Sequence, residues 1–133
     1  MLRFTEALNK AAESGELRPM VERWLDPEIE YLPPPGVPEP GPYRGRDEME
    51  AFYEFFRDQF DRIRITVRDL AESNGRVLYR QSVEVTGTGS GAVVADDSFC
   101  VATVRAGRLL RIVEDYDRAE ALRRAGLESS RSK

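Results

Sequence analysis

The chain has 133 residues, of which 41% are hydrophobic and 33% are charged, and its formal net charge is −4. This length suits one domain with a single hydrophobic core. The acidic balance disfavours nucleic-acid binding, which needs a clustered basic surface. The sequence contains no histidine, and Cys100 is its one cysteine, so the commonest metal ligands are missing. We therefore expect no metal site and no cofactor.

The cellular setting is predicted from cysteine usage and from the apolar runs. A single cysteine leaves no internal disulfide, so a reducing cytoplasm is the expected location. The first residues lack an apolar run of signal-peptide length, and no stretch approaches the roughly 18 apolar residues of a membrane span. We expect no membrane association.

The first third of the chain predicts two short helices, a strand and a loop. Apolar residues recur at helical spacing over residues 4–15 and again over residues 17–25. Alternation over residues 28–32 predicts a short strand. Six of the eight prolines then fall within residues 33–42, which excludes a helix or a central strand there and predicts a loop.

The middle of the chain predicts a longer helix followed by a meander of four antiparallel strands. The helix begins at Gly45, and its buried stripe comprises Met49, Phe52, Tyr53, Phe56 and Phe60. The period changes to two from Ile63, which predicts a strand, and Asn74-Gly75 is a strong hairpin signal. The further strands are predicted over residues 76–85, 98–105 and 109–116.

Glycine-rich and polar segments complete the predicted organisation. Residues 87–91 (GTGSG) predict a second hairpin, because no helix follows them as a dinucleotide-binding loop requires. Asp117 and Glu120 have the spacing of a capping box, which predicts a last helix ending at Gly126. We expect one domain over residues 1–127 and a frayed polar tail over residues 128–133.

Four local strings and the order of elements resemble the SnoaL-like branch of the nuclear transport factor 2-like superfamily. The strings are residues 42–49 (PYRGRDEM), 87–91 (GTGSG), 106–109 (AGRL) and 114–122 (EDYDRAEAL). The resemblance implies an α+β fold, a cystatin-like roll: a cone-shaped, curved antiparallel sheet wrapped by three N-terminal helices, with a short C-terminal helix. It also implies an apolar pocket on the concave face. One such scaffold supports many functions, so the resemblance is specific for fold rather than for activity.

Strand alternation then assigns side chains to the concave face. The resemblance to limonene epoxide hydrolase places a catalytic carboxylate of the last strand at Glu114, which turns Leu110, Ile112 and Tyr116 inward. Glu114 is the predicted catalytic residue, because a carboxylate that is buried among apolar side chains can act as a general acid or base near neutral pH. An open, solvated rim position for Glu114 stays an alternative. The predicted ligand-binding residues are Tyr31, Tyr79, Gln81, Tyr116, Trp24, Phe52, Phe56, Cys100, Ala102 and Ile112.

The sequence departs from the catalytic relatives at the positions that matter most. Gln81 and Val83 stand where the epoxide hydrolase relatives carry an arginine and a second aspartate. Leu32 stands where ketosteroid isomerases carry their base, and the histidine of SnoaL-type cyclases is missing. Two functions therefore stay open: a cofactor-free isomerase, cyclase or hydrolase acting on an apolar or polycyclic molecule through Glu114, and a non-catalytic ligand-binding or dimerisation module.

The convex face of the predicted sheet mixes apolar and charged residues. Relatives commonly dimerise through this surface, so we expect a homodimer. The residues predicted to lie there are Arg80, Ser82, Glu84, Phe99, Val101, Arg111 and Asp115.

Overall fold

The computed structural model describes residues 1–36, 41–87 and 93–127, with the side chains of residues 93–95 left out. The 87–91 hairpin falls largely outside the described residues, and the predicted 128–133 tail falls outside them altogether. The elements in chain order are α1 (Leu2–Ser14), α2 (Leu17–Trp24), β1 (Leu25–Leu32), β2 (Tyr43–Arg44), α3 (Gly45–Asp58), β3 (Phe60–Ser73), β4 (Arg76–Gly87), β5 (Val93–Arg105), β6 (Arg108–Asp115) and α4 (Arg118–Arg124).

These strands form one six-stranded sheet in the order β2-β1-β6-β5-β4-β3. The four-strand antiparallel meander from β3 to β6 confirms the prediction. The sheet as a whole is mixed, because β1 pairs with β6 in parallel. Parallel pairing is possible because the long connection through α3 and the meander returns the chain to the same edge. The parallel pair matters for the site, since it places Tyr31 opposite Ile112.

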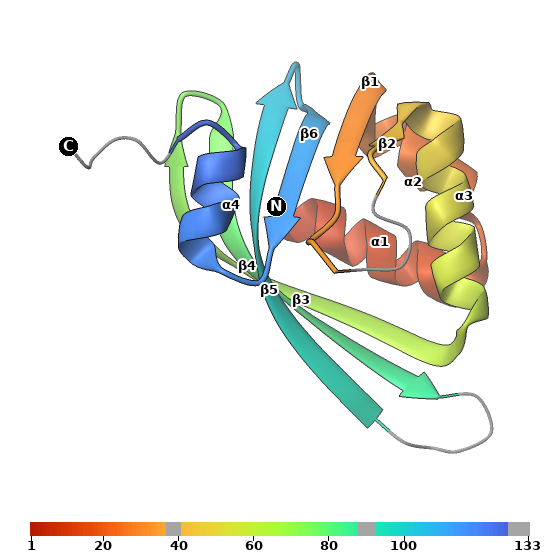
Figure 1. Ribbon diagram of the computed structural model, residues 1–133. Coiled ribbons are helices and arrows are strands. Elements are labelled where there is room, and N and C mark those ends of the chain that lie inside the picture. Colours follow the sequence, from red (N-terminus) through yellow and green to blue (C-terminus); the bar gives the residue numbers. More distant parts are fainter. Residues whose placement is uncertain (37–40, 88–92, 128–133) are drawn as a thin grey trace.

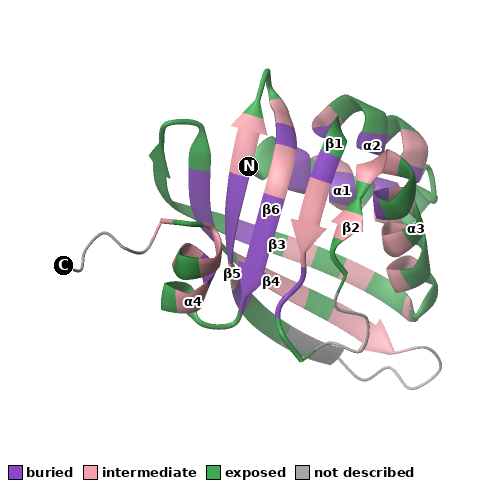
Figure 2. Ribbon diagram, turned by 45° about the horizontal axis from the view of Figure 1, so that its top comes forward, coloured by how far each residue is buried: buried purple, intermediate pink, exposed green. Residues whose placement is uncertain are grey.

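Helices cover both faces of this sheet, and Figure 1 shows α1, α2 and α3 on one side and α4 on the other. The main core lies under the first three helices, where Val21, Leu25 and Ile29 are fully buried. Figure 2 shows that burial is concentrated in β5, β6 and the adjoining part of β4, whereas much of β3 is half-buried or exposed.

Turn and cap chemistry fixes the ends of several elements. Asn74 and Gly75 both have positive φ, 52° and 78°, as a type I′ hairpin requires, so the predicted β3–β4 turn is confirmed. Asp117 caps α4 by accepting a hydrogen bond from the Ala119 amide at 2.9 Å. Glu120 pairs with Arg123 instead of completing a capping box.

Two predicted positions of the last strand, Leu110 and Tyr116, are corrected. The register slips at Val104, so Leu109 rather than Leu110 joins the main core. The irregular pairing accommodates one extra residue, so on one side of the shift the side chains that face the core and those that face outward change places. The last strand ends at Asp115, and Tyr116 lies beyond it with 48% of its surface exposed.

The convex face carries its own small core. Leu78 and Val101 are buried there against Ala121 of α4, with Phe99 and Leu122 packed alongside. Part of the predicted dimer surface is therefore covered by this chain's own C-terminal helix. Next to it, Asp97 accepts hydrogen bonds from Arg80 and Ser82, both at 2.7 Å. The homodimer stays a prediction.

Candidate functional site

The candidate site is centred on Glu114, which is 9% exposed. The Tyr31 hydroxyl donates a short hydrogen bond to its Oε1. The Ser98 hydroxyl donates to Oε2 at 2.6 Å, and the Gln81 amide donates to the same oxygen at 3.3 Å. Residues from four neighbouring strands thus converge on one enclosed carboxylate. The three donors fix the orientation of the carboxylate, whose oxygens are the acceptors in these contacts.

Counting acceptor positions shows what this carboxylate can still do. An ionised carboxylate has about four lone-pair positions, two on each oxygen. Two donors occupy Oε2 and one occupies Oε1 among the described contacts. One acceptor position on Oε1 is therefore left for a proton or for a ligand donor.

Besides Tyr31, the polar side chains of Tyr53, Tyr79 and Cys100 lie close enough to Glu114 to sense its charge. Burial raises the pKa of the Tyr31 phenol, and the negative charge of Glu114 raises it further. The pKa of Tyr53 is raised by the same two causes in the same order. Tyr79 is buried and hydrogen-bonded to Cys100, and burial raises the pKa of that thiol above its usual range. These phenols are neutral donors at neutral pH, and Cys100 is a neutral thiol rather than a nucleophile.

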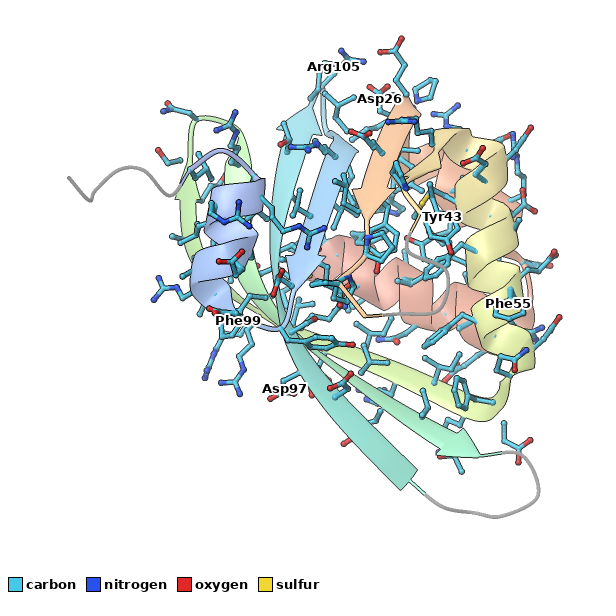
Figure 3. The ribbon with its side chains drawn as sticks, in the orientation of Figure 1. Asp26, Tyr43, Phe55, Asp97, Phe99 and Arg105 are labelled. Carbon is cyan, nitrogen blue, oxygen red and sulfur yellow. The ribbon has the colours of Figure 1, made fainter. Side chains whose placement is uncertain are left out.

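Aromatic rings from β1, β2, α3 and β3 form a continuous series beside Glu114. The ring of Phe52 lies 5.3 Å from that of Tyr31, 4.9 Å from that of Tyr43 and 6.2 Å from that of Phe56. Phe56 in turn lies 5.4 Å from Phe60. We call these five residues the aromatic row. Figure 3 shows the Tyr43 side chain lying between β1 and α3, whereas Phe55 points outward from α3.

The concave face next to the aromatic row is apolar and incompletely covered. Ile65 pairs with Val83 and Ile63 with Val85, on the same face as Gln81. All four of these apolar residues are only half-buried, as are the five members of the aromatic row. Apolar side chains that face the concave side without being buried leave surface on which an apolar ligand can bind.

The comparisons with known proteins agree with this fold. The family model of the SnoaL-like domain matches residues 2–112. The chain belongs to the SnoaL-like family. No functionally curated protein matches this SnoaL-like chain at a significant level.

Solved structures similar to this SnoaL-like protein share its fold at low sequence identity. One is an NTF2-like protein of unknown function from Burkholderia pseudomallei, with 21% identity, a TM-score of 0.69 and 97% of each chain covered. Another is IdmH from Streptomyces antibioticus, described as a candidate polyketide cyclase, with 21% identity, a TM-score of 0.67 and coverage of 93% of this chain and 96% of that one. A candidate SnoaL-like polyketide cyclase from Jannaschia has 12% identity and a TM-score of 0.67, and covers 96% of this chain and 91% of that one.

The structure gathers some predicted site residues of the SnoaL-like protein and separates others. Tyr31 and Gln81 contact Glu114 directly. The remaining residues of the central strands are packed into the main core beneath the site, with Tyr79, Cys100, Ala102 and Ile112 between 0% and 5% exposed. Phe52 and Phe56 belong to the aromatic row. Their roles in binding a ligand stay predictions.

Two predicted residues lie apart from this group. Tyr116 is at the rim, where burial and then Asp96 raise the pKa of its phenol. It is half-exposed rather than inside the pocket as expected, because β6 ends one residue before it. Trp24 packs edge-on against Phe4, with ring centroids 6.4 Å apart, at the other end of the core.

Sequence reasoning did not assign three polar residues of this region, Ser98, Tyr43 and Tyr53, to the site. Ser98 contacts Glu114 directly through its hydroxyl. Tyr43 and Tyr53 were assigned to a loop motif and to a buried helix stripe. The signal for Tyr53 was an aromatic residue at helical spacing from Met49 and Phe56, and the signal for Tyr43 was an aromatic residue just before the start of the helix.

The described part of the chain lacks both a metal-binding cluster and a helix that could span a membrane. No group of three or more cysteine, aspartate or glutamate side chains there is placed to hold a metal ion. Within the same residues, no helix is both long and apolar enough to cross a bilayer.

Proposed function

We propose that this SnoaL-like protein binds an apolar, ring-containing small molecule against the aromatic row. In this proposal, Glu114 removes a proton from a carbon next to the ligand's carbonyl group, without a cofactor. The observation that carries the proposal is the enclosed Glu114 carboxylate, which is oriented by three donors and keeps one acceptor position on Oε1.

The proposed reaction needs only proton transfers. Oε1 of Glu114 takes the proton, and the electrons of the broken C–H bond form the double bond of an enolate. The neutral phenol of Tyr53, which the charge of Glu114 influences, is the proposed donor to the enolate oxygen. If a carbon–carbon double bond lies next to the deprotonated carbon, the enolate is conjugated with it, and protonated Glu114 returns the proton to the far end of that bond, which completes an isomerisation. Alternatively, the enolate carbon attacks a second carbonyl of the same ligand, and Glu114 protonates the resulting alkoxide, which closes a ring.

The substrate class follows from the surface beside the carboxylate. Flat apolar rings stack favourably on the five members of the aromatic row, and Ile65 and Val83 extend this surface on the sheet. Structural relatives described as candidate polyketide cyclases support a substrate with several carbonyl groups. Ring closure of such a molecule begins with the proton removal proposed for Glu114.

A non-catalytic ligand-binding role is the second candidate, and one observation favours it. Three of the four acceptor positions of Glu114 are already filled by the protein's own donors, as in a structural polar network. Gln81 and Val83 also stand on the inward face of β4 where the epoxide hydrolase relatives carry an arginine and a second acid. In this role, Glu114 fixes the position of Tyr31 and accepts a ligand hydrogen bond.

Hydrogen–deuterium exchange into a cyclic ketone separates the two functions. We would follow the α-carbon protons of 2-tetralone in D₂O by NMR, with wild-type protein, Glu114→Gln and the control Glu84→Gln. Glu84 is an exposed residue on the opposite face of the sheet. The enzymatic proposal predicts exchange above the buffer rate that falls at least about 100-fold in Glu114→Gln and is unchanged in Glu84→Gln.

Thermal stabilisation by the ketone is measured on the same three proteins. Equal exchange rates for wild type and Glu114→Gln contradict the proposed catalysis. Stabilisation of the wild type without exchange above the buffer rate supports the non-catalytic binder. A ketone that neither stabilises any of the proteins nor exchanges contradicts both functions for this class of ligand.

A further inference from the structure

A hollow that Trp24 helps to line lies at the end of the core away from Glu114. Its volume is about 280 Å³, and the apolar part of its lining includes Phe4, Trp24, Val77, Val104 and Leu109. Trp24 is only half-buried, so part of its ring is available to a ligand. The volume lies near the lower limit of ligand pockets, roughly 300–1,000 Å³, and suits a molecule of one or two rings.

Charged residues of predominantly positive sign surround this hollow. Arg3 and Arg108 line it together with one acid, Asp69. An adjoining hollow of about 370 Å³ shares Arg3 and Trp24 and adds Lys10, Arg23 and Glu6. Four cations thus face two carboxylates, although the chain as a whole carries a net charge of −4. A local excess of positive charge on an acidic protein favours an anionic ligand.

The guanidinium groups are placed near the aromatic ring. The Arg23 guanidinium carbon lies 4.6 Å from the centroid of the Trp24 ring. Arg108 donates one long hydrogen bond, 3.4 Å, to the Glu22 carbonyl, which leaves most of its donors for other partners within the described contacts. A guanidinium group binds a carboxylate through two parallel hydrogen bonds.

This hollow is distinct from the site proposed for catalysis. Leu109 and Glu114 are five residues apart on β6, which corresponds to about 16 Å along a strand. None of the residues lining either hollow contacts the Glu114 carboxylate. A ligand in the hollow therefore does not require the chemistry proposed above.

We propose that the Trp24 hollow is a binding site for a small aromatic carboxylate. The ring of the ligand packs against Trp24 and Leu109, and its carboxylate binds Arg108 and Arg3. The mixture of an apolar interior and a basic rim discriminates this ligand from a neutral molecule of the same shape.

The test follows the indole N–H signal of Trp24, the one tryptophan in the sequence, by ¹H–¹⁵N NMR. The two probes are 2-naphthoate and its neutral analogue 2-naphthamide, each titrated into the full chain. The proposal predicts a saturable shift with 2-naphthoate and at least roughly 10-fold weaker binding of 2-naphthamide. Arg108→Gln weakens binding of 2-naphthoate by roughly 10-fold. The control Arg118→Gln, at the exposed start of α4, leaves the affinity unchanged.

Several outcomes overturn the proposal. They are the lack of a saturable shift with 2-naphthoate, equal affinity for the two probes, and wild-type affinity in Arg108→Gln. The comparison of the two probes uses the wild-type protein, so it holds even if a variant fails to fold. Glu114→Gln is the final control. Loss of 2-naphthoate binding in that variant overturns the independence of the two sites, whereas retained binding together with lost ketone exchange supports both proposals.

Discussion

Replacing Arg124 with methionine should cost more stability than any other single arginine substitution in α4. The Arg124 guanidinium donates to the Glu114 carbonyl oxygen at 2.6 Å, to Asp115 Oδ2 at 3.1 Å and to the Pro33 carbonyl oxygen at 3.1 Å. The side chains of Arg124 and Asp115 are 23% and 7% exposed. One residue thus joins α4, the end of β6 and the segment that follows β1.

The magnitude follows from the environment of Asp115. Removing one partner of a buried ion pair costs about 3–5 kcal/mol, and the partial exposure of Arg124 places the expected loss near the lower end, about 3 kcal/mol. For a chain of 133 residues, this loss lowers the melting temperature by about 12 °C, at about 4 °C per kcal/mol. Thermal unfolding followed by circular dichroism measures the shift.

Arg123→Met is the matched control in the same helix. Arg123 pairs with Glu120 while its side chain is 57% exposed, so its loss should cost no more than about 0.5 kcal/mol. The double variant Asp115→Asn/Arg124→Met should be more stable than Arg124→Met alone, because it no longer leaves a buried charge unpaired. A loss below about 1 kcal/mol in Arg124→Met, or equal losses in the two arginine variants, would refute this reasoning.

Three further predictions concern other polar contacts of the fold. The Glu28 amide, at 2.8 Å, and then Arg105 lower the pKa of Asp26, so the stability due to its carboxylate is present above about pH 4 and is lost as the pH falls through the lowered value. Asp26→Asn should therefore cost about 2 kcal/mol at pH 7 in urea unfolding and progressively less as the pH falls below about 4; a difference that does not change with pH would contradict this. Asn9→Ala should cost about 2 kcal/mol in the same assay, because the Asn9 amide binds both the N–H and the C=O of Ile65 at 2.8 Å; a cost near zero would show that water replaces it. Burial favours the neutral phenols of Tyr31, Tyr53 and Tyr79, so their stabilisation is present below about pH 10 and is lost as the pH rises above it. At about pH 11, phenolate absorbance from these three residues should appear only as the chain unfolds, and comparison with variants carrying Phe at each position assigns the signal; their ionisation in the folded protein would contradict this prediction.

Local chemistry accounts for the parts of the fold that the sequence predicted correctly. Alternating side chains and the Asn74-Gly75 turn predicted the β3–β4 hairpin, because both signals act over a few residues. The parallel pairing of β1 with β6 could not be predicted from alternation, since it depends on how elements about 80 residues apart meet. The register shift next to Val104 could not be predicted either, because an extra residue in a strand reverses which side chains face the core and leaves no local signal in the sequence.

The candidate site was predicted in part for the same reasons. The family resemblance, together with strand alternation, assigned Glu114, Gln81 and Tyr31 to one face, and the register brings their side chains into contact. Alternation could not identify Ser98 as the hydrogen-bond partner of Glu114, because that contact depends on how β5 pairs with β6. The separation of Trp24 from Glu114 was also missed, since helical periodicity does not show which end of a core a helix covers.

The position of a bound cyclic ketone tests the central claim most directly. Intermolecular nuclear Overhauser effects can be measured between 2-tetralone and the isotope-labelled protein. The account predicts contacts from the ketone's α-carbon protons to the Glu114 side chain and from its aromatic ring to Phe52 and Phe56. Contacts confined to Trp24 and Leu109 would contradict it, because the ketone would then lie at the other end of the core from the carboxylate.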